Sequence, residues 1–219
     1  MKQMNKIIMQ PAREQVANFL RQQIFDGKIK TNDELTQEQI ADSLGVSRMP
    51  VREAFQILDQ EGILKVQKRK AIVQPFTVED VADHLEIRGL LEGEAAFKAA
   101  TNYGKDFQDL QNALKTIEEC TLNMDVISYI QANYAFHKEV WNASESKRLI
   151  TVLDYLWKGL PSNLPLLLPE QMDKSLLEHQ KIVDCIVNNK PESAKKVMMQ
   201  HIHRSIEDFI DHYNKRRNQ

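Results

Sequence analysis

The hydrophobic positions of this 219-residue chain recur mainly with the period of an amphipathic helix. Few segments alternate apolar and polar residues as a half-exposed strand does. Only seven glycines and seven prolines interrupt the chain, so turns are sparse for its length. The pattern therefore predicts a mainly α-helical protein.

The first third of the chain departs from this pattern in one place. Three helices are predicted ahead of it, at about residues 11–27, 36–45 and 47–62. Thr36 and Ser47 are good N-caps for the second and third helices. Two β-prone runs then follow, at residues 63–67 and 71–76, and predict a two-stranded hairpin. Helix, tight turn, helix and hairpin is the layout of a winged helix-turn-helix.

A second domain begins just after the hairpin. Pro75 interrupts the strand pattern, and Thr77 with Glu79 and Asp80 forms a helix start signal. The junction is therefore expected at about residues 75–78. Residues 1–76 are predicted to form the winged helix-turn-helix, and residues 77–219 an all-helical bundle of about six helices.

Composition narrows the class of protein. The chain is 42% hydrophobic and 27% charged, which is ordinary for a globular protein. No apolar run approaches the length of a membrane span, and the first residues lack the apolar core of a secretory signal. A cytoplasmic protein without a membrane partner is expected. Cys120 and Cys185 stand alone, so neither a disulfide framework nor a thiolate zinc site is indicated.

The formal net charge of −2 is unevenly distributed. Residues 1–75 carry 12 Lys and Arg against 9 Asp and Glu, whereas residues 76–219 carry 17 against 22. A basic front is compatible with a polyanionic partner such as nucleic acid.

Arg48 and Arg52 open the third predicted helix and share one of its faces. In a helix-turn-helix, the first turn of the second helix enters the major groove, and the arginine fork fits guanine edges or phosphates. The alternative is that both arginines only solvate a surface helix, paired with Glu53 or Asp59. The surrounding layout favours DNA.

The stretch "LGVSRMPVREAF", within residues 12–75, resembles the DNA-binding domain of GntR-family bacterial transcription regulators. The resemblance implies contacts with double-stranded operator DNA, from the recognition helix and the wing, by Ser47, Arg48, Met49, Pro50, Arg52, Lys68, Arg69 and Lys70. Two positions depart from the family. Glu38 replaces a DNA-contacting arginine of some members, so that contact is expected to be missing. Arg69 stands where wings usually carry glycine, which favours a side-chain contact with phosphate or the minor groove.

Four polar residues of the second domain fall on predicted buried faces of three helices: Asn133, His137, His179 and His201. A buried polar side chain without a partner costs about 1–3 kcal/mol, so these four are expected to meet one another or a ligand. Three imidazoles and an amide oxygen suit a divalent transition metal. The alternative is that each histidine is an ordinary, hydrogen-bonded core residue.

The segments "HLEIRGLLEGEAAFKAA", "NYAFH", "EHQKIV" and "VMMQHI" resemble successive landmarks of the FCD effector domain, found in the FadR-type branch of the same family. The resemblance implies that Asn133 and the three histidines bind Zn, Ni or Mn. It also implies a small carboxylate effector, with Arg88 as a second contact; a surface ion pair between Arg88 and Glu92 is the alternative. Asn133 in place of aspartate leaves the metal more positive, which favours an anionic ligand.

The sequence thus predicts a homodimeric, metabolite-responsive regulator that reads a palindromic operator, with repression as the default direction and activation possible. A metal sensor without organic effector is one alternative. A metal-dependent enzyme is another, but Glu178, the acid beside His179, is predicted to point away from that histidine's face and offers no convincing general base. A ridge of small residues is expected to admit a helix from the same or another subunit: Gly89, Gly93, Ala96 and Ala100.

Overall fold

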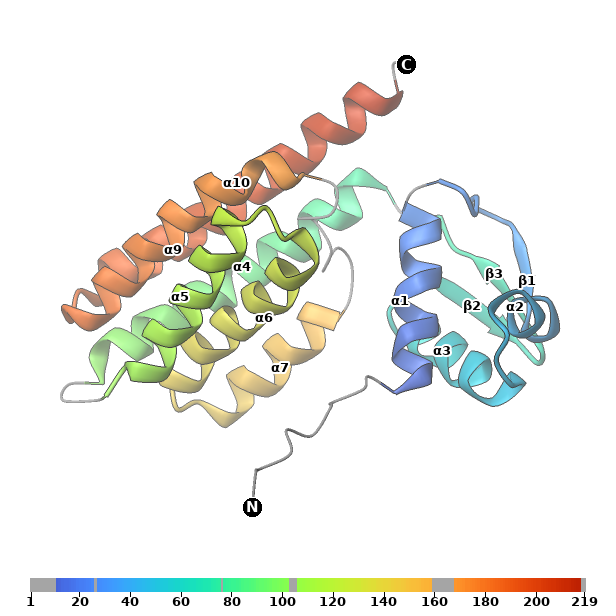
Figure 1. Cartoon of the computed structure of the whole chain (residues 1–219), viewed down its shortest axis with the longest axis horizontal. Helices are drawn as coiled ribbons and strands as arrows, with labels where there is room; N and C mark the ends of the chain where they lie inside the picture. Colours follow the sequence, from blue (N-terminus) through green and yellow to red (C-terminus); the bar gives the residue numbers. More distant parts are fainter. Residues whose placement is uncertain (1–10, 26, 76, 103–105, 159–167, 218–219) are drawn as a thin grey trace. The chain divides into compact units, whose positions relative to one another are not determined.

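The computed structural model describes residues 11–25, 27–75, 77–102, 106–158 and 168–217 (Figure 1). The chain divides into two compact units, residues 1–76 and residues 77–219. Within the described ranges, no helix combines the length and apolar character that crossing a bilayer requires.

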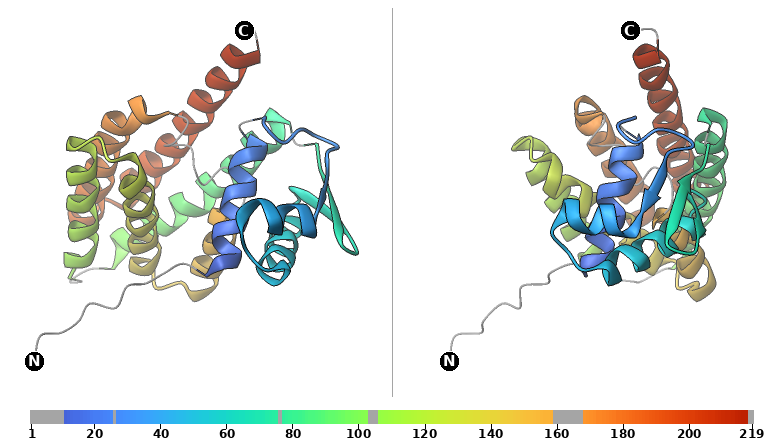
Figure 2. Two further views of the ribbon diagram at one scale, coloured as in Figure 1. Left: turned by 45° about the vertical axis from the view of Figure 1, so that its right-hand side comes forward. Right: turned by 90° about the vertical axis from the view of Figure 1, so that its right-hand side faces the viewer.

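The N-terminal unit is a winged helix-turn-helix. Its elements in chain order are α1 (Ala12–Phe25), β1 (Glu34–Thr36), α2 (Gln37–Leu44), α3 (Arg48–Gln60), β2 (Leu64–Gln67) and β3 (Lys70–Val73). The predicted helices and both predicted strands are present, with ends that differ by a few residues. Helices α1 and α2 both pack against α3, and the strands lie beside them (Figure 2). Leu20, Phe55 and Leu58 are fully buried in this small core.

The sheet has three strands rather than the predicted two. Its order is β1-β3-β2, and both pairs are antiparallel. The strand that was not predicted, β1, is only three residues long, and among them only Leu35 is buried. A single buried residue gives no alternation to detect, so pairing with β3 decides the conformation of this segment, through the register Leu35 to Ala71.

The hairpin turn of the wing is tight. Gln67 pairs with Lys70, which leaves Lys68 and Arg69 as the two turn residues. Lys68 has a φ of 60°, in the left-handed region where glycine is favoured. The backbone strain that a wing glycine would relieve therefore falls on Lys68, while Arg69 avoids it.

The C-terminal unit is all-helical, as predicted. Its described elements are α4 (Val78–Thr101), α5 (Gln108–Leu122), α6 (Val126–Ala143), α7 (Lys147–Lys158), a 3-10 turn (Pro169–Gln171), α9 (Met172–Val187) and α10 (Pro191–Arg217). Thr77 and Asp80 form the reciprocal capping box that begins α4. Helix α4 packs against α6, α7, α9 and α10, so it is the central helix of the bundle (Figure 1).

The small-residue ridge on α4 faces α10 of the same unit. A Cβ added at Gly89 would lie 3.3 Å from the Cγ2 atom of Ile202. At Gly93 it would lie 2.7 Å from the Cγ atom of Met199 and 3.3 Å from the Lys195 carbonyl oxygen. Glycine therefore lets the two helix backbones approach closely, which settles a question that the sequence left open.

Candidate functional site

Helix α3 presents a cationic face at its first turn. Ser47 occupies the N-cap position with extended backbone, and its hydroxyl makes no capping bond. Arg48, Met49 and Arg52 are exposed, and Pro50 is half-buried. The opposite face anchors the helix in the core through Val51, Ala54, Phe55 and Leu58. Arg48 and Arg52 can therefore contact a partner without any change in the packing of the helix.

The acids near these arginines are arranged differently from the predicted alternative. Glu53 pairs with an arginine of α1 at 3.8 Å, and Asp59 accepts a hydrogen bond of 2.7 Å from the backbone N–H of Val66. Arg48 instead forms an ion pair with Glu38, from the first turn of α2. Pairing with Glu53 or Asp59 is therefore wrong as an explanation of Arg48.

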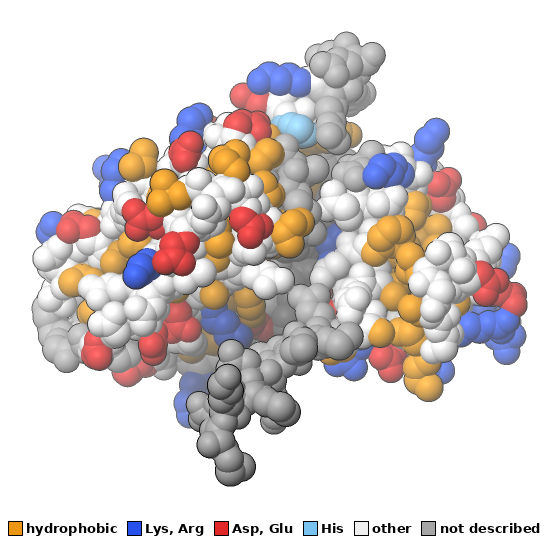
Figure 3. Space-filling model, in the orientation of Figure 1, with side chains coloured by type: hydrophobic (Ala, Val, Ile, Leu, Met, Phe, Trp, Pro, Cys, Tyr) orange, Lys and Arg blue, Asp and Glu red, His pale blue; other side chains and the backbone are white. Residues whose placement is uncertain are grey.

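The wing turn is fixed beside the start of α2. The backbone N–H of Gln37 donates to the Arg69 carbonyl oxygen at 3.1 Å. Lys68 and Arg69 are exposed at the turn, and Lys70 forms a 2.6 Å ion pair with Glu34 across the β1–β3 pair. Figure 3 shows Lys and Arg side chains next to Asp and Glu side chains along the right-hand edge of this unit. The predicted DNA-contacting surface is thus partly neutralised by the unit's own acids.

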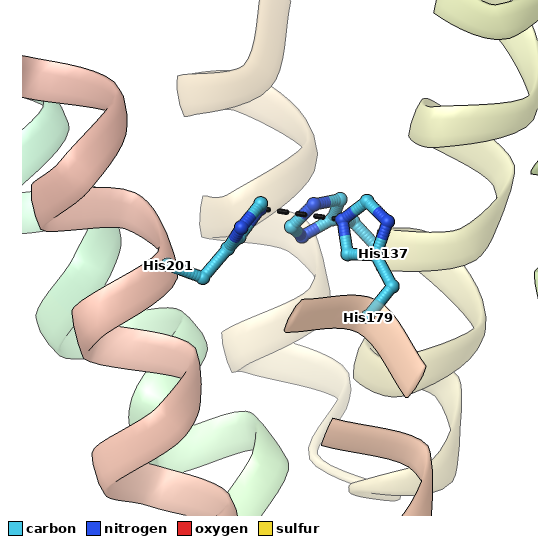
Figure 4. A group of neighbouring side chains, drawn as sticks. All are labelled: His137, His179 and His201. Carbon is cyan, nitrogen blue, oxygen red and sulfur yellow. Dashed lines mark hydrogen bonds between the residues drawn. The ribbon is translucent and has the colours of Figure 1, made fainter. Parts of the chain in front are cut away.

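Three of the four predicted metal ligands converge in the C-terminal unit. His137 comes from α6, His179 from α9 and His201 from α10, and their rings point toward one another (Figure 4). One donor atom from each lies within 4.8 Å of the others, and all three residues are buried. Residues far apart in the sequence therefore form one compact imidazole cluster.

A buried carboxylate orients His137. The Nδ1 atom of His137 is hydrogen-bonded to Glu92, which also accepts from Trp141 Nε1 at 3.0 Å and from Arg88 Nε at 2.7 Å. Burial opposes ionisation of Glu92, but its electrostatic interactions with His137 and Arg88 and these hydrogen bonds lower its pKa to about 2. Because an ionised carboxylate only accepts, Nδ1 of His137 carries the proton, and Nε2 is the nitrogen that faces the cluster.

A second carboxylate orients His201 in the same way. Its Nδ1 donates to Glu178 at 2.7 Å, and Arg204 donates to the same carboxylate from Nε at 2.6 Å and from Nη2 at 2.8 Å. Burial opposes ionisation of Glu178, but these hydrogen bonds lower its pKa to about 2. Burial lowers the pKa of His201 to about 4 and that of His179 well below its usual range, so both are neutral at pH 7.

The cluster leaves ring nitrogens unsatisfied. His137 Nε2 and His179 Nδ1 are buried and have no hydrogen-bond partner among the residues that the structure describes. His179 Nε2 lies 3.3 Å from His201 Nε2. A tetrahedral zinc ion with nitrogens at about 2.0–2.1 Å separates two of them by about 3.3 Å. Neutral imidazoles backed by carboxylates are the usual environment of a transition metal, so the donor set fits one.

The other two predicted residues of this site lie in the same unit. Asn133 is half-buried on α6, one turn before His137, so it stays a predicted ligand. Arg88 is 7% exposed, and its Cζ atom lies 4.4 Å from the centre of the Trp157 ring. The surface ion pair considered for Arg88 and Glu92 is therefore wrong, because their pair is buried.

Sequence reasoning missed the residues that orient the histidines. Glu92 follows Arg88 by one helical turn, a spacing that suggested a surface pair. Glu178 faces His201 rather than His179, its neighbour in the sequence. The available signal was the position of His201 and Arg204, one turn apart on α10, where a single acid on another helix can bind both.

Comparison with known proteins matches both units. The family described as "Bacterial regulatory proteins, gntR family" matches residues 12–74, and the "FCD domain" matches residues 83–204. A protein of Paenarthrobacter nicotinovorans, named "Probable D-xylose utilization operon transcriptional repressor", is 27% identical over 190 residues, 86% of this chain and 84% of that protein. The Glc operon transcriptional activator of Escherichia coli is 25% identical over 219 residues, 88% of this chain and 86% of the activator. A solved structure described as E. coli McbR/YncC has a TM-score of 0.71 at 21% identity, over 94% of this chain and 100% of that one, which supports the fold.

Proposed function

Because the chain belongs to the GntR family of bacterial regulatory proteins and carries its FCD domain, we propose that it is a dimeric, metabolite-responsive repressor. Its N-terminal unit binds a palindromic operator, and its C-terminal unit binds a small carboxylate at a divalent-metal site. The family and the relatives described above are transcription regulators and not enzymes, so a metal-dependent enzyme has no support.

Operator binding is supported by the exposed first turn of α3. Arg48 and Arg52 project from a helix whose other face is anchored in the core. One winged helix reaches only one half-site, so a dimer that reads two half-sites gains most of its specificity from symmetry. The relatives named above include a repressor and an activator. Repression is proposed because the Paenarthrobacter nicotinovorans relative, at 27% identity, is named a repressor, whereas the activator is 25% identical.

The metal site rests on one observation above all: three buried imidazoles converge, and His137 Nε2 and His179 Nδ1 have no hydrogen-bond partner among the described residues. Glu92 and Glu178 hold His137 and His201 in the Nδ1–H tautomer, so that Nε2 is the donor atom of each. His179 provides the third nitrogen, and Asn133 is the proposed fourth ligand. A divalent ion bound there supplies positive charge and open positions for a carboxylate.

The charges around the cluster favour an anionic effector. Arg88 balances Glu92, and Arg204 is shared between Glu178 and Asp208, so these groups together leave one negative charge. A divalent ion would therefore leave one positive charge for a ligand to neutralise. Arg88 has further guanidinium N–H groups besides the Nε that it donates to Glu92, and we assign these to the second oxygen of a carboxylate.

The competing proposal is a metal sensor whose only physiological ligand is the ion. The two proposals differ in what changes DNA affinity: metal alone for a sensor, or a carboxylate in the presence of metal for an effector site.

Metal binding is tested with His137→Ala and a matched control, His203→Ala. His203 lies on α10 but is exposed, so its loss removes an imidazole away from the cluster. We expect wild-type protein and His203→Ala, purified without chelator, to carry about one equivalent of metal and to lose several degrees of melting temperature on chelation. His137→Ala should lack both the metal and this response.

Elemental analysis and thermal unfolding with and without chelator provide the measurement. Wild-type protein that carries no zinc, nickel or manganese, and that none of these ions stabilises when added, would remove the metal site from the proposal.

A further inference from the structure

The ion pair between Glu38 and Arg48 joins the two helices of the DNA-binding motif. Glu38 lies in the first turn of α2, and Arg48 is the first residue of α3. Their side chains are 64% and 59% exposed, so the pair faces solvent and not the core. An exposed ion pair of this kind contributes little to the stability of a fold. We therefore expect the ion pair to affect how Arg48 binds DNA and not how stable the fold is.

Glu38 also lies where the recognition helix and the wing meet. Its neighbour Gln37 holds the wing turn through a backbone hydrogen bond to the Arg69 carbonyl oxygen at 3.1 Å and a side-chain contact with the Lys68 carbonyl oxygen at 3.5 Å. A carboxylate at this place is next to the basic groups that would approach the DNA backbone. It lowers the positive potential of the surface beside Arg48.

The shape of the guanidinium group decides what remains possible for Arg48. Arginine has five N–H donors in a planar fork, and the ion pair with Glu38 uses the Nη2 end. The remaining donors can still bind the O6 and N7 atoms of guanine, which are neutral acceptors. A phosphate contact is different, because it brings a second anion close to the Glu38 carboxylate. The pair therefore favours a base-edge contact over a phosphate contact.

We propose that Glu38 is a specificity-determining residue, which holds Arg48 for base-edge recognition and lowers the affinity of the protein for DNA of any sequence. The inference rests on operator binding through Arg48, as proposed above. Glu38 replaces a DNA-contacting arginine of some family members, and the inference gives this glutamate a role of its own.

The test compares the full-length wild-type protein with Glu38→Gln, which keeps the size of the side chain and removes its charge. Wild-type protein first selects duplexes from a randomised pool. The most enriched duplex and a shuffled duplex of the same composition then serve as probes, titrated between about 50 and 200 mM salt.

Glu38→Gln should bind the shuffled duplex about 3- to 10-fold more tightly, because the released Arg48 of each subunit neutralises one more phosphate. The slope of log affinity against log salt on that duplex should steepen by about 0.9 per subunit, or about 1.8 for a dimer bound through both subunits. Affinity for the selected duplex should change by less than about 2-fold, since its guanine contact leaves the ion pair intact. The ratio of the two affinities therefore falls.

Two controls separate this role from a general effect of charge. Glu14→Gln removes one acid from α1, where the carboxylate pairs with the Arg13 side chain at 3.9 Å, and it should leave the ratio unchanged. Adding Glu38→Gln to Arg48→Ala should also have no effect, because Glu38 acts through Arg48.

The inference is overturned if Glu38→Gln leaves the ratio of affinities unchanged, if Glu14→Gln shifts it equally, or if the shift persists without Arg48. Failure of the wild-type protein to enrich any sequence would instead contradict operator binding itself, so the two failures are distinguishable.

Discussion

At the scale of single residues, the C-terminal unit contains the same arginine–carboxylate–histidine arrangement twice. An arginine and a histidine share one carboxylate: Arg88 with His137 at the buried Glu92, and Arg204 with His201 at the half-buried Glu178. The arginine keeps the acid ionised, and the ionised acid fixes the proton of the histidine on Nδ1. Nε2 of each of these two imidazoles thereby faces the cluster. This arrangement fits a metal cation.

The same burial makes the metal-free protein sensitive to mild acid. The folded-state pKa of His201 is lowered to about 4, and that of His179 is also lowered, whereas both return to about 6.5 on unfolding. As pH falls below about 6.5, His179 and His201 bind protons in the unfolded chain but not in the folded protein. The free energy of unfolding therefore falls progressively down to about pH 4. Lowered pKa values near 2 mean that Glu92 and Glu178 lose their stabilising effect only below about pH 4.5.

Thermal unfolding in excess chelator, between pH 7.5 and 5, checks this prediction. The melting temperature of the metal-free protein should fall by several degrees, and His203→Ala should follow the same curve because that residue is exposed. A melting temperature that is constant over this range would show that the buried histidines are not held neutral.

At the scale of secondary structure, the sequence predicts long helices well, but it predicts short strands and contacts between helices poorly. The amphipathic period and the caps Thr36 and Thr77 indicate where helices begin. Strand β1 could not be predicted, because three residues with one buried side chain carry no period, and only pairing with β3 defines them. Likewise the three histidines were identifiable as polar residues on buried faces. Their carboxylate partners were not, because a contact such as Glu178 with His201 depends on how α9 and α10 pack.

Packing of α4 on α10 is predicted to depend on Gly93. A valine there would place side-chain atoms against Met199 and the backbone oxygen of Lys195, which lies within 3.3 Å of a Cβ alone. Gly93→Val should destabilise the protein by about 1–3 kcal/mol, as overpacking of a close contact does. Denaturant unfolding measures the loss. Leu90→Val, on an exposed position of the same helix, controls for β-branching and should cost much less; equal losses would mean that the close approach is unimportant.

At the scale of the whole molecule, DNA binding is proposed for one unit and ligand binding for the other. A ligand changes DNA affinity only to the extent that it binds the DNA-competent and DNA-incompetent states differently. The three histidines come from α6, α9 and α10, so a metal bound by them would connect three helices of the C-terminal unit. A change in the packing of these helices would then be the most direct route from the proposed ligand to DNA affinity.

A carboxylate that acts on DNA affinity through the histidine cluster needs both the metal and His137. The affinity of the metal-loaded protein for its selected duplex is determined by fluorescence anisotropy across a panel of small carboxylic acids, for the wild type, His137→Ala and His203→Ala. At least one acid should change the affinity of the wild type and of His203→Ala by about 5-fold or more, in the range of ordinary allosteric coupling. The change should vanish in His137→Ala and after chelation. An acid response that survives both the loss of His137 and the removal of metal would show that the acid does not act through the histidine cluster.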